Sequence, residues 1–335
     1  MMGCRSLNKI GFVAVTALVS CIAAVTLSTR SHAADAGTWT QKAPMPLART
    51  EVAVAAVDGK LYVIGGSTAD IDGLTLVQEY DPATDKWRDR APLPQGLNHM
   101  AAAALNGKIY TVGGFSGRSP TDTGGRLHQG ATTFAFEYDP KADSWRTLPP
   151  LKAPRGSVGV AALDGKIHAV GGRNLEVKTV TTHEVYDPVT DKWTDAAPLP
   201  TARDHLAAVA ADGFLHVIGG RFDGRDENAD KHDIYDPKTD SWSAGPTLPT
   251  ARSGLQSTLY KDKILVIGGE TSKYANIENQ AFDVKTGKWV ILTPVPVGLH
   301  ASAGATIGDH AYFPGGSAKQ GGDAITAQLL EFTLP

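Results

Sequence analysis

The chain has 335 residues, of which 42% are apolar and 20% are charged, an ordinary balance for a globular protein that can bury a core. This composition excludes an intrinsically disordered chain. The formal net charge is −3 and no basic cluster of five or more residues occurs, which argues against nucleic acid and anionic membrane surfaces as partners.

The first 33 residues have the pattern of a secretory signal peptide. Two basic residues precede an apolar run from Ile10 to Leu27, and residues 31–33 offer small side chains to a signal peptidase. We expect cleavage after Ala33, a periplasmic or extracellular protein, and no membrane span after cleavage. Two alternatives remain open: an uncleaved membrane anchor, and a lipoprotein attached through Cys21.

Both cysteines, Cys4 and Cys21, lie in this leader segment, so the mature chain is expected to contain none. Disulfides, thiolate nucleophiles and cysteine-based metal sites are thereby excluded. The segment also carries three positive charges and no acid, so its removal takes the net charge from −3 to −6.

Two markers recur along the rest of the chain. One is a set of six tryptophans: Trp39, Trp87, Trp145, Trp193, Trp242 and Trp289. The other is a Gly-Gly doublet, which ends at Gly66, Gly114, Gly172, Gly220, Gly269 and Gly316. Successive markers of each kind are 48, 58, 48, 49 and 47 residues apart. Two independent markers with one period indicate an internal repeat of about 50 residues.

Each repeat predicts four short strands, here termed a to d. In the first repeat an apolar run at residues 51–57 is strand a, and Asp58-Gly59 forms a hairpin turn. Residues 60–66 form strand b, and a loop of variable length follows. Strand c ends in Tyr-Asp-Pro, a tight turn follows, and strand d carries the tryptophan. No apolar period of 3.6 residues lasts long enough for a long helix.

Six such sheets packed around an axis form a β-propeller, in which each sheet buries its faces against its neighbours. The last repeat ends with a strand c at residues 327–335 and has no tryptophan after it, whereas Trp39 has no strand c before it. We therefore predict that residues 34–335 form an all-β, six-bladed propeller, in which the Trp39 strand completes the final blade and leaves no free sheet edge.

The two markers also predict how the blades are packed. The doublets are expected to let a neighbouring tryptophan or backbone segment approach strand b closely. A buried indole is expected to stabilise each blade by about 2–3 kcal/mol.

The repeated phrases resemble kelch repeats over the span from Trp39 to Pro335. The resemblance rests on Tyr-Asp-Pro-x-Thr-Asp-x-Trp, as at residues 186–193, on the doublets, and on linkers such as "PLPTAR" at residues 198–203. Kelch propellers include protein-binding domains, sugar-processing enzymes and a copper oxidase, so the resemblance implies a fold more sharply than a function. A copper oxidase of the galactose oxidase type requires a tyrosine crosslinked to cysteine, which the mature chain lacks.

The loops between strands b and c and the linkers between strands d and a share one face of the predicted ring. These loops differ between repeats, and the longest, residues 115–130, accounts for the single 58-residue interval. Variable loops on a rigid ring indicate a binding face. The fourth loop holds four acids, Asp223, Asp226, Glu227 and Asp230, at a spacing that matches no calcium loop. No metal or cofactor is predicted.

Arginine recurs sixteen residues before four of the six doublets, and leucine stands in its place at Leu97 and Leu299. One interpretation is that these arginines brace adjacent blades through backbone carbonyls. The other is an axial ligand pocket, with further residues after the doublets that are implied by the resemblance to ligand-binding kelch domains. The candidate ligand-binding residues are Arg49, Asn98, His99, Arg155, Arg173, Asn174, Arg203, His205, Arg221, Arg252, Glu270 and His300.

Two functional hypotheses follow. The first is a monomeric, secreted binding module that recognises a protein or glycan on the loop face. The second is a cofactor-free enzyme resembling the periplasmic kelch mutarotase of sialic acid, with Glu51 and His99 or His205 as acid–base candidates and Arg155 or Arg203 as a carboxylate clamp. The first is preferred because the candidate residues occupy repeat-equivalent positions, whereas a catalytic pair usually breaks a repeat.

Overall fold

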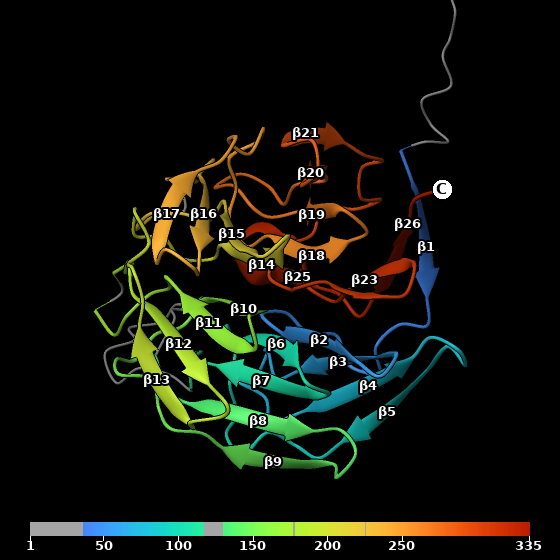
Figure 1. Cartoon of the computed structure of the whole chain (residues 1–335). Helices are drawn as coiled ribbons and strands as arrows, with labels where there is room; N and C mark the ends of the chain where they lie inside the picture. Colours follow the sequence, from blue (N-terminus) through green and yellow to red (C-terminus); the bar gives the residue numbers. More distant parts are fainter. Residues whose placement is uncertain (1–35, 117–129, 177, 225) are drawn as a thin grey trace, which may run out of the picture. The chain divides into compact units, whose positions relative to one another are not determined.

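A computed structural model describes residues 36–335 except 117–129, 177 and 225, and these residues form a ring of six four-stranded sheets (Figure 1). The all-β, six-bladed propeller predicted from the repeat is thus confirmed. The predicted signal peptide and most of the long loop at residues 115–130 lie outside the described residues. Within the part of the chain that is described, no helix has the length and apolar character needed to cross a membrane.

The first three blades are continuous in sequence. Blade one comprises β2 (Ala53–Val57), β3 (Lys60–Ile64), β4 (Val77–Asp81) and β5 (Lys86–Arg90). Blade two comprises β6 (Ala101–Leu105), β7 (Lys108–Val112), β8 (Ala135–Asp139) and β9 (Ser144–Thr147). Blade three comprises β10 (Gly159–Leu163), β11 (Lys166–Val170), β12 (His183–Asp187) and β13 (Lys192–Asp195).

The last three blades include the one that joins the two ends of the described chain. Blade four comprises β14 (Ala207–Ala211), β15 (Phe214–Ile218), β16 (His232–Asp236) and β17 (Ser241–Ala244). Blade five comprises β18 (Gln256–Tyr260), β19 (Lys263–Ile267), β20 (Asn279–Asp283) and β21 (Lys288–Ile291). Blade six comprises β22 (Ala305–Ile307), β23 (His310–Pro314), β26 (Leu329–Thr333) and β1 (Thr38–Lys42). Its b–c loop adds a small hairpin of β24 (Ser317–Lys319) and β25 (Asp323–Ile325) around a 3-10 turn, η1 (Gln320–Gly322).

Within each blade the strands are antiparallel, with strand a innermost and strand d outermost (Figure 1). The inner strands of blades one to four are rich in alanine and valine, because six strands converge at the axis where there is little room for large side chains. Strand b is buried on both faces, as its unbroken apolar sequence predicts. The outermost strands are largely exposed.

The predicted closure of the ring is confirmed. β1 pairs antiparallel with β26, and Trp39 lies opposite Phe332 in this register. Figure 1 shows the two strands side by side, β1 in blue and β26 in dark red. The indole of Trp39 also packs on Phe332 and Phe313, with ring centroids 4.8 and 5.7 Å away. Strand d of the sixth blade is therefore supplied by the N-terminal end of the propeller.

The expectation of buried indoles needs a correction. The fully buried aromatic residue of a blade is the penultimate residue of strand c, such as Tyr80, Tyr138 or Tyr186, each 0% exposed, whereas the tryptophans are only partly buried. Each indole Nε1 instead donates a hydrogen bond of 2.8–2.9 Å to a carbonyl in the linker of the preceding blade. The acceptors, in chain order of the tryptophans, are Thr293, Ala43, Ala91, Pro149, Ala197 and Pro246. The indoles therefore tie blades together rather than fill their cores.

The Gly-Gly doublets allow a close approach of backbone rather than of tryptophan. Gly65 and Gly66 have φ values of 61° and 90°, and a Cβ atom on Gly66 would lie 2.5 Å from the carbonyl oxygen of Thr50. The same segment, just before strand a, reaches the doublet in every blade. The doublet is thus needed both for its left-handed backbone and for the linker that passes over it.

Candidate functional site

The four repeated arginines lie inside the blades rather than in a ligand pocket. Arg49, Arg155, Arg203 and Arg252 are 0–1% exposed. Arg155 donates to the carbonyls of Gly171, Thr182 and Ala169, and it pairs with Glu184 at 2.8 Å. Ala169 and Glu184 belong to strands b and c of the same blade, and Gly171 and Thr182 directly adjoin those strands. These contacts fit the bracing interpretation, although the brace acts within one blade and not between adjacent blades, and we leave the four arginines out of the candidate site.

A pattern within the chain supports this structural role. Each arginine faces a polar side chain two residues before the buried aromatic residue of strand c. These partners are Gln78, Glu184, Asp233 and Gln280. Where leucine replaces arginine, the partner is apolar as well: Leu97 shares a core with Phe136, and Leu299 shares one with Leu330. Arginine and its partner therefore change together, as a buried polar pair must.

The axis is encircled by six equivalent residues that stand just before strand a. They are Glu51, His99, Ser157, His205, Gly254 and Ala301, here called the axial ring. The amide of each donates to the carbonyl of the ring residue in the preceding blade, at 2.5–3.1 Å, and Glu51 donates to Ala301 to complete the circle. All six have a φ between 51° and 63°. The repeat thus places six residues around one axis in a left-handed backbone conformation, and five of them carry side chains.

Three of the axial-ring side chains come together. A carboxylate oxygen of Glu51 and ring nitrogens of His99 and His205 all lie within 4.8 Å of one another. His99 Nε2 is 3.1 Å from Glu51 Oε1, and the rings of His99 and His205 are edge to face with centroids 5.2 Å apart. Burial, with the Arg221 cation acting in the same direction, lowers the pKa of His99 to about 3. The predicted acid–base candidates are therefore neighbours, and His99 is a neutral imidazole at physiological pH.

A second layer of buried charges lies behind His205. Asp204, 0% exposed, accepts hydrogen bonds from His205 Nδ1 at 2.7 Å and from Arg221 Nε at 3.1 Å, and it forms a very short contact with Arg173 Nε. Arg221 also donates to Glu270 at 3.0 Å and to His205 Nε2 at 3.0 Å. Two guanidinium groups and two carboxylates therefore form a compensated network around one imidazole.

Of the remaining candidate residues, Asn98 and His300 lie next to the axial ring and this network, whereas Asn174 does not. Asn98 accepts from His99 Nδ1 at 2.6 Å, so it touches the axial ring. His300 contacts the carbonyl of Lys319 at 2.7 Å and lies 3.7 Å from Glu270. Asn174 instead accepts from backbone amides within its own loop, and it takes no part in the network.

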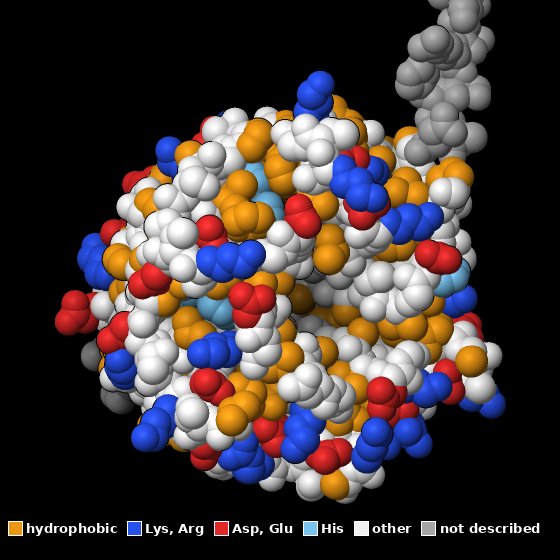
Figure 2. All heavy atoms as spheres, viewed as in Figure 1, with side chains coloured by type: hydrophobic (Ala, Val, Ile, Leu, Met, Phe, Trp, Pro, Cys, Tyr) orange, Lys and Arg blue, Asp and Glu red, His pale blue; other side chains and the backbone are white. Residues whose placement is uncertain are grey.

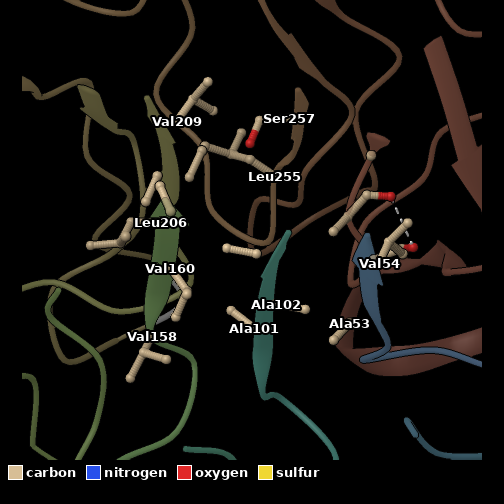
Figure 3. Close-up of a pocket in the computed structure, with 18 of the residues that line it drawn as sticks. Ala53, Val54, Ala101, Ala102, Val158, Val160, Leu206, Val209, Leu255 and Ser257 are labelled. Carbon is tan, nitrogen blue, oxygen red and sulfur yellow. Dashed lines mark hydrogen bonds between the residues drawn. The ribbon is translucent and has the colours of Figure 1, made fainter. Parts of the chain in front are cut away.

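A cavity of about 380 Å³ runs along the axis and is lined by the axial ring and by the inner strands. Apart from Glu51, His99 and His205, its walls are mostly alanine, valine and leucine, and Figure 3 shows such side chains from several blades pointing into one space. Figure 2 shows one face of the ring, hollowed near its centre with apolar side chains at the bottom. The predicted arginines, Glu270 and His300 do not line this cavity.

Asp204 is the main residue of this network that sequence reasoning omitted. It occupies the same repeat position as Asn98, directly before the axial ring, and lies between two selected residues, Arg203 and His205. This equivalence was the available signal. The brace partners on strand c were likewise detectable, because they are polar only in the repeats that carry arginine.

The fold and the axial ring together define a six-bladed β-propeller closed by its own N-terminal strand. A family model described as the KLHDC2/KLHL20/DRC7 Kelch-repeats domain matches residues 124–316, and a Kelch motif model matches residues 48–94. The chain belongs to the Kelch-repeat family.

Similar proteins agree with this assignment. The chain is 32% identical over 149 residues to Kelch-like protein 35 of Mus musculus, a match that covers 41% of this chain and 21% of the relative. It is 31% identical over 153 residues to Kelch-like protein terF of Aspergillus terreus, covering 44% and 32%. The match thus spans a third or less of these curated relatives. The structure of YjhT superposes with a TM-score of 0.72 at 18% identity, covering 86% of this chain and 95% of that chain, which shows a shared fold.

Proposed function

We propose that this propeller acts outside the cytoplasm as a binding module that recognises a protein through its b–c and d–a loops. The location rests on the leader pattern of the first 33 residues. The kind of ligand is supported by the Kelch-repeat family, whose propellers are typically protein-binding.

This proposal rests on the positions of the exposed large apolar side chains. Most of those in the described residues lie in the b–c loops or d–a linkers. They are Leu47, Ile71, Phe134, Leu175, Tyr274, Ile277 and Val297, with exposed fractions of 37–60%. Apolar and aromatic side chains that project from one face are typical of the centre of a protein interface.

A paired substitution tests the proposal. Leu175 and Tyr274 are 60% and 54% exposed, so the double variant Leu175→Ser/Tyr274→Ser is expected to fold normally. Val189 is 92% exposed and lies in a c–d turn on the opposite face, so Val189→Ser is the matched control. Tagless mature protein is immobilised and the proteins it retains from extracytoplasmic extract are quantified by mass spectrometry.

We expect the wild type to retain specific proteins. The double variant Leu175→Ser/Tyr274→Ser should retain at least about tenfold less of them, and the Val189→Ser control should retain as much as the wild type. Equal retention by both variants, or equal loss, contradicts the proposal. A glycan array run in parallel addresses the carbohydrate alternative: a glycan bound by the wild type and lost in the loop-face variant would replace the protein ligand.

The mutarotase is kept as a second candidate, because Glu51, His99 and His205 converge at one point. Opening and closing a sugar ring requires only that protons be moved, which a carboxylate and imidazoles can do. NMR of freshly dissolved α-sialic acid tests this activity directly. An equilibration rate unchanged by the protein rules it out.

A further inference from the structure

We propose that Glu51, His99 and His205 bind one divalent transition-metal ion of the zinc class on the propeller axis. This proposal is independent of protein recognition by the loop face. It is an alternative to cofactor-free mutarotation, since an ion would occupy the groups that move protons in that scheme. The sequence predicted no metal, because the three residues are 48 and 106 positions apart and match no local metal motif.

The distances between the three side chains suit such an ion. Ligands placed about 2.0–2.2 Å from one ion in a tetrahedral arrangement lie roughly 3.4 Å from one another. His99 Nε2 and Glu51 Oε1 are 3.1 Å apart, and ligand atoms of all three residues lie within 4.8 Å of one another. Two imidazoles and one carboxylate form a donor set that zinc and iron(II) proteins use.

The hydrogen bonds around the two histidines favour the same conclusion. His99 Nδ1 donates to Asn98 Oδ1 at 2.6 Å, and His205 Nδ1 donates to Asp204 Oδ1 at 2.7 Å. Metal-binding histidines almost always donate their second ring nitrogen to an oxygen in this way, which fixes the ring and its tautomer. In both residues Nε2 is then the nitrogen that would bind the ion, and both acceptors come from the residue directly before the histidine.

Ser157 Oγ lies 3.4 Å from His205 Nε2, and a closer competitor for that nitrogen is Arg221. Its Nη2 donates to His205 Nε2 at 3.0 Å, so this hydrogen bond must give way when an ion binds. Arg221 keeps its contacts with Asp204 and Glu270, at 3.1 and 3.0 Å. Asp204 and Glu270 together balance the charges of Arg173 and Arg221. Glu51 therefore supplies an additional negative charge for the cation.

The axial ring also provides a rigid support and an open side. Its six backbone hydrogen bonds hold the Cα atoms of all three ligands in one circle. The cavity of about 380 Å³ is lined by Glu51, His99 and His205, so the fourth coordination position of a bound ion would face this space.

The test uses tagless mature protein that has been stripped with a chelator and then titrated with Zn²⁺ by calorimetry. Metal content is measured after gel filtration. We expect one Zn²⁺ per chain, and binding weakened at least about tenfold in Glu51→Gln and in His205→Gln. Asn98→Ala, which removes the oxygen that orients His99, is expected to weaken binding by about tenfold as well. The exposed His310, replaced by Gln, controls for adventitious binding at surface histidines and should leave the affinity unchanged.

Two results would overturn the proposal. One is a wild-type protein that retains no Zn²⁺, and the other is a Glu51→Gln variant that binds Zn²⁺ as tightly as the wild type. The melting temperature of every variant is measured in chelator, so that misfolding is recognised. Cobalt(II) gives a measurement that needs no variant: the visible bands of four-coordinate cobalt are expected, and the weak spectrum of aqueous cobalt would contradict the site.

Discussion

Arg155 illustrates what a buried charge demands of its surroundings. Burial lowers the pKa of Arg155 to about 10, even though the Glu184 carboxylate acts in the opposite direction. The guanidinium therefore remains charged at neutral pH. Its neighbours are the carboxylate of Glu184, 0% exposed, and three backbone carbonyls. Such a pair contributes little net stability compared with an apolar pair of similar volume, but removing one partner is costly.

The chain itself suggests the experiment on this pair. We expect Arg155→Leu to lower the free energy of unfolding by about 3–5 kcal/mol, because Glu184 is left buried without its partner. The double variant Arg155→Leu/Glu184→Phe copies Leu97 and Phe136 of blade two, and we expect it to recover most of the loss. Urea denaturation of the three proteins measures this. A double variant as unstable as the single one would contradict a paired brace.

At the scale of the strand, β1 determines whether the ring is closed. It pairs with β26 along five residues, and its Trp39 donates to the carbonyl of Thr293 in the linker that follows blade five. Without β1, the edge of β26 would be exposed together with the apolar side chains of Leu330 and Phe332. An unpaired strand edge of this kind is a template for association.

We predict that a chain beginning at Ala43 is less stable than one beginning at Ala36 by at least about 3 kcal/mol, and that it self-associates. The stability loss reflects the missing indole and five ladder pairs, and the association reflects the open edge. Thermal denaturation and light scattering after size exclusion measure the two effects. Equal melting temperatures with both chains monomeric would show that the last blade does not need its fourth strand.

The strands were predictable because each repeat carries several local signals that agree. In the first four repeats an apolar run, an Asp-Gly or Asn-Gly turn and a Tyr-Asp-Pro turn determine where strands begin and end, and two independent markers determine how many blades exist. The predicted strand a at residues 51–57 nevertheless begins two residues too early, since β2 covers Ala53–Val57. Glu51 instead belongs to the axial ring. Its φ of 55° lies outside the β region, so it precedes the paired part of the strand.

The site was predictable only in part. Repeat equivalence placed Glu51, His99 and His205 around the axis, because one position in every blade must face it. It could not separate side chains that point to the axis from arginines that turn back into a blade, since both recur with the same period. Only the partner on strand c distinguishes them, and that partner is 28–30 residues away in sequence.

For the molecule as a whole, two pairs of buried histidines contribute to the response to acid. In blade three His168 Nδ1 lies 3.0 Å from His183 Nε2, and in blade four His216 Nδ1 lies 2.9 Å from His232 Nε2. The second histidine of each pair also contacts a carbonyl through Nδ1, at 3.1 and 3.2 Å, so each pair is a chain of neutral rings. Burial lowers the four pKa values to about 3 for His168 and about 4 for the other three.

We predict that acid destabilises the protein through these histidines. Their pKa in the unfolded chain is about 6.5, so below that pH the unfolded state binds protons that the folded state does not. The contribution of these histidines to the free energy of unfolding is therefore fully present above about pH 6.5. It is lost as the pH drops toward 4, by on the order of 1 kcal/mol per pH unit for each histidine.

Urea denaturation between pH 5 and 7 checks this prediction. His232→Gln should make the dependence of unfolding free energy on pH shallower, whereas His310→Gln, on the surface, should leave it unchanged. A slope in His232→Gln equal to that of the wild type would show that His232 has the same pKa in the folded and unfolded states.

The circle of hydrogen bonds at the axial ring has a consequence for how this molecule can diversify. Because each of these six amides donates to the ring residue of the preceding blade, none of them is left to donate toward the centre, and the side chains at these positions set the chemistry of the opening. Three places hold Glu, His and His, and three hold Ser, Gly and Ala. The residue at each position can therefore be exchanged without changing the backbone of the propeller, so single substitutions at the axis can give rise to new specificities.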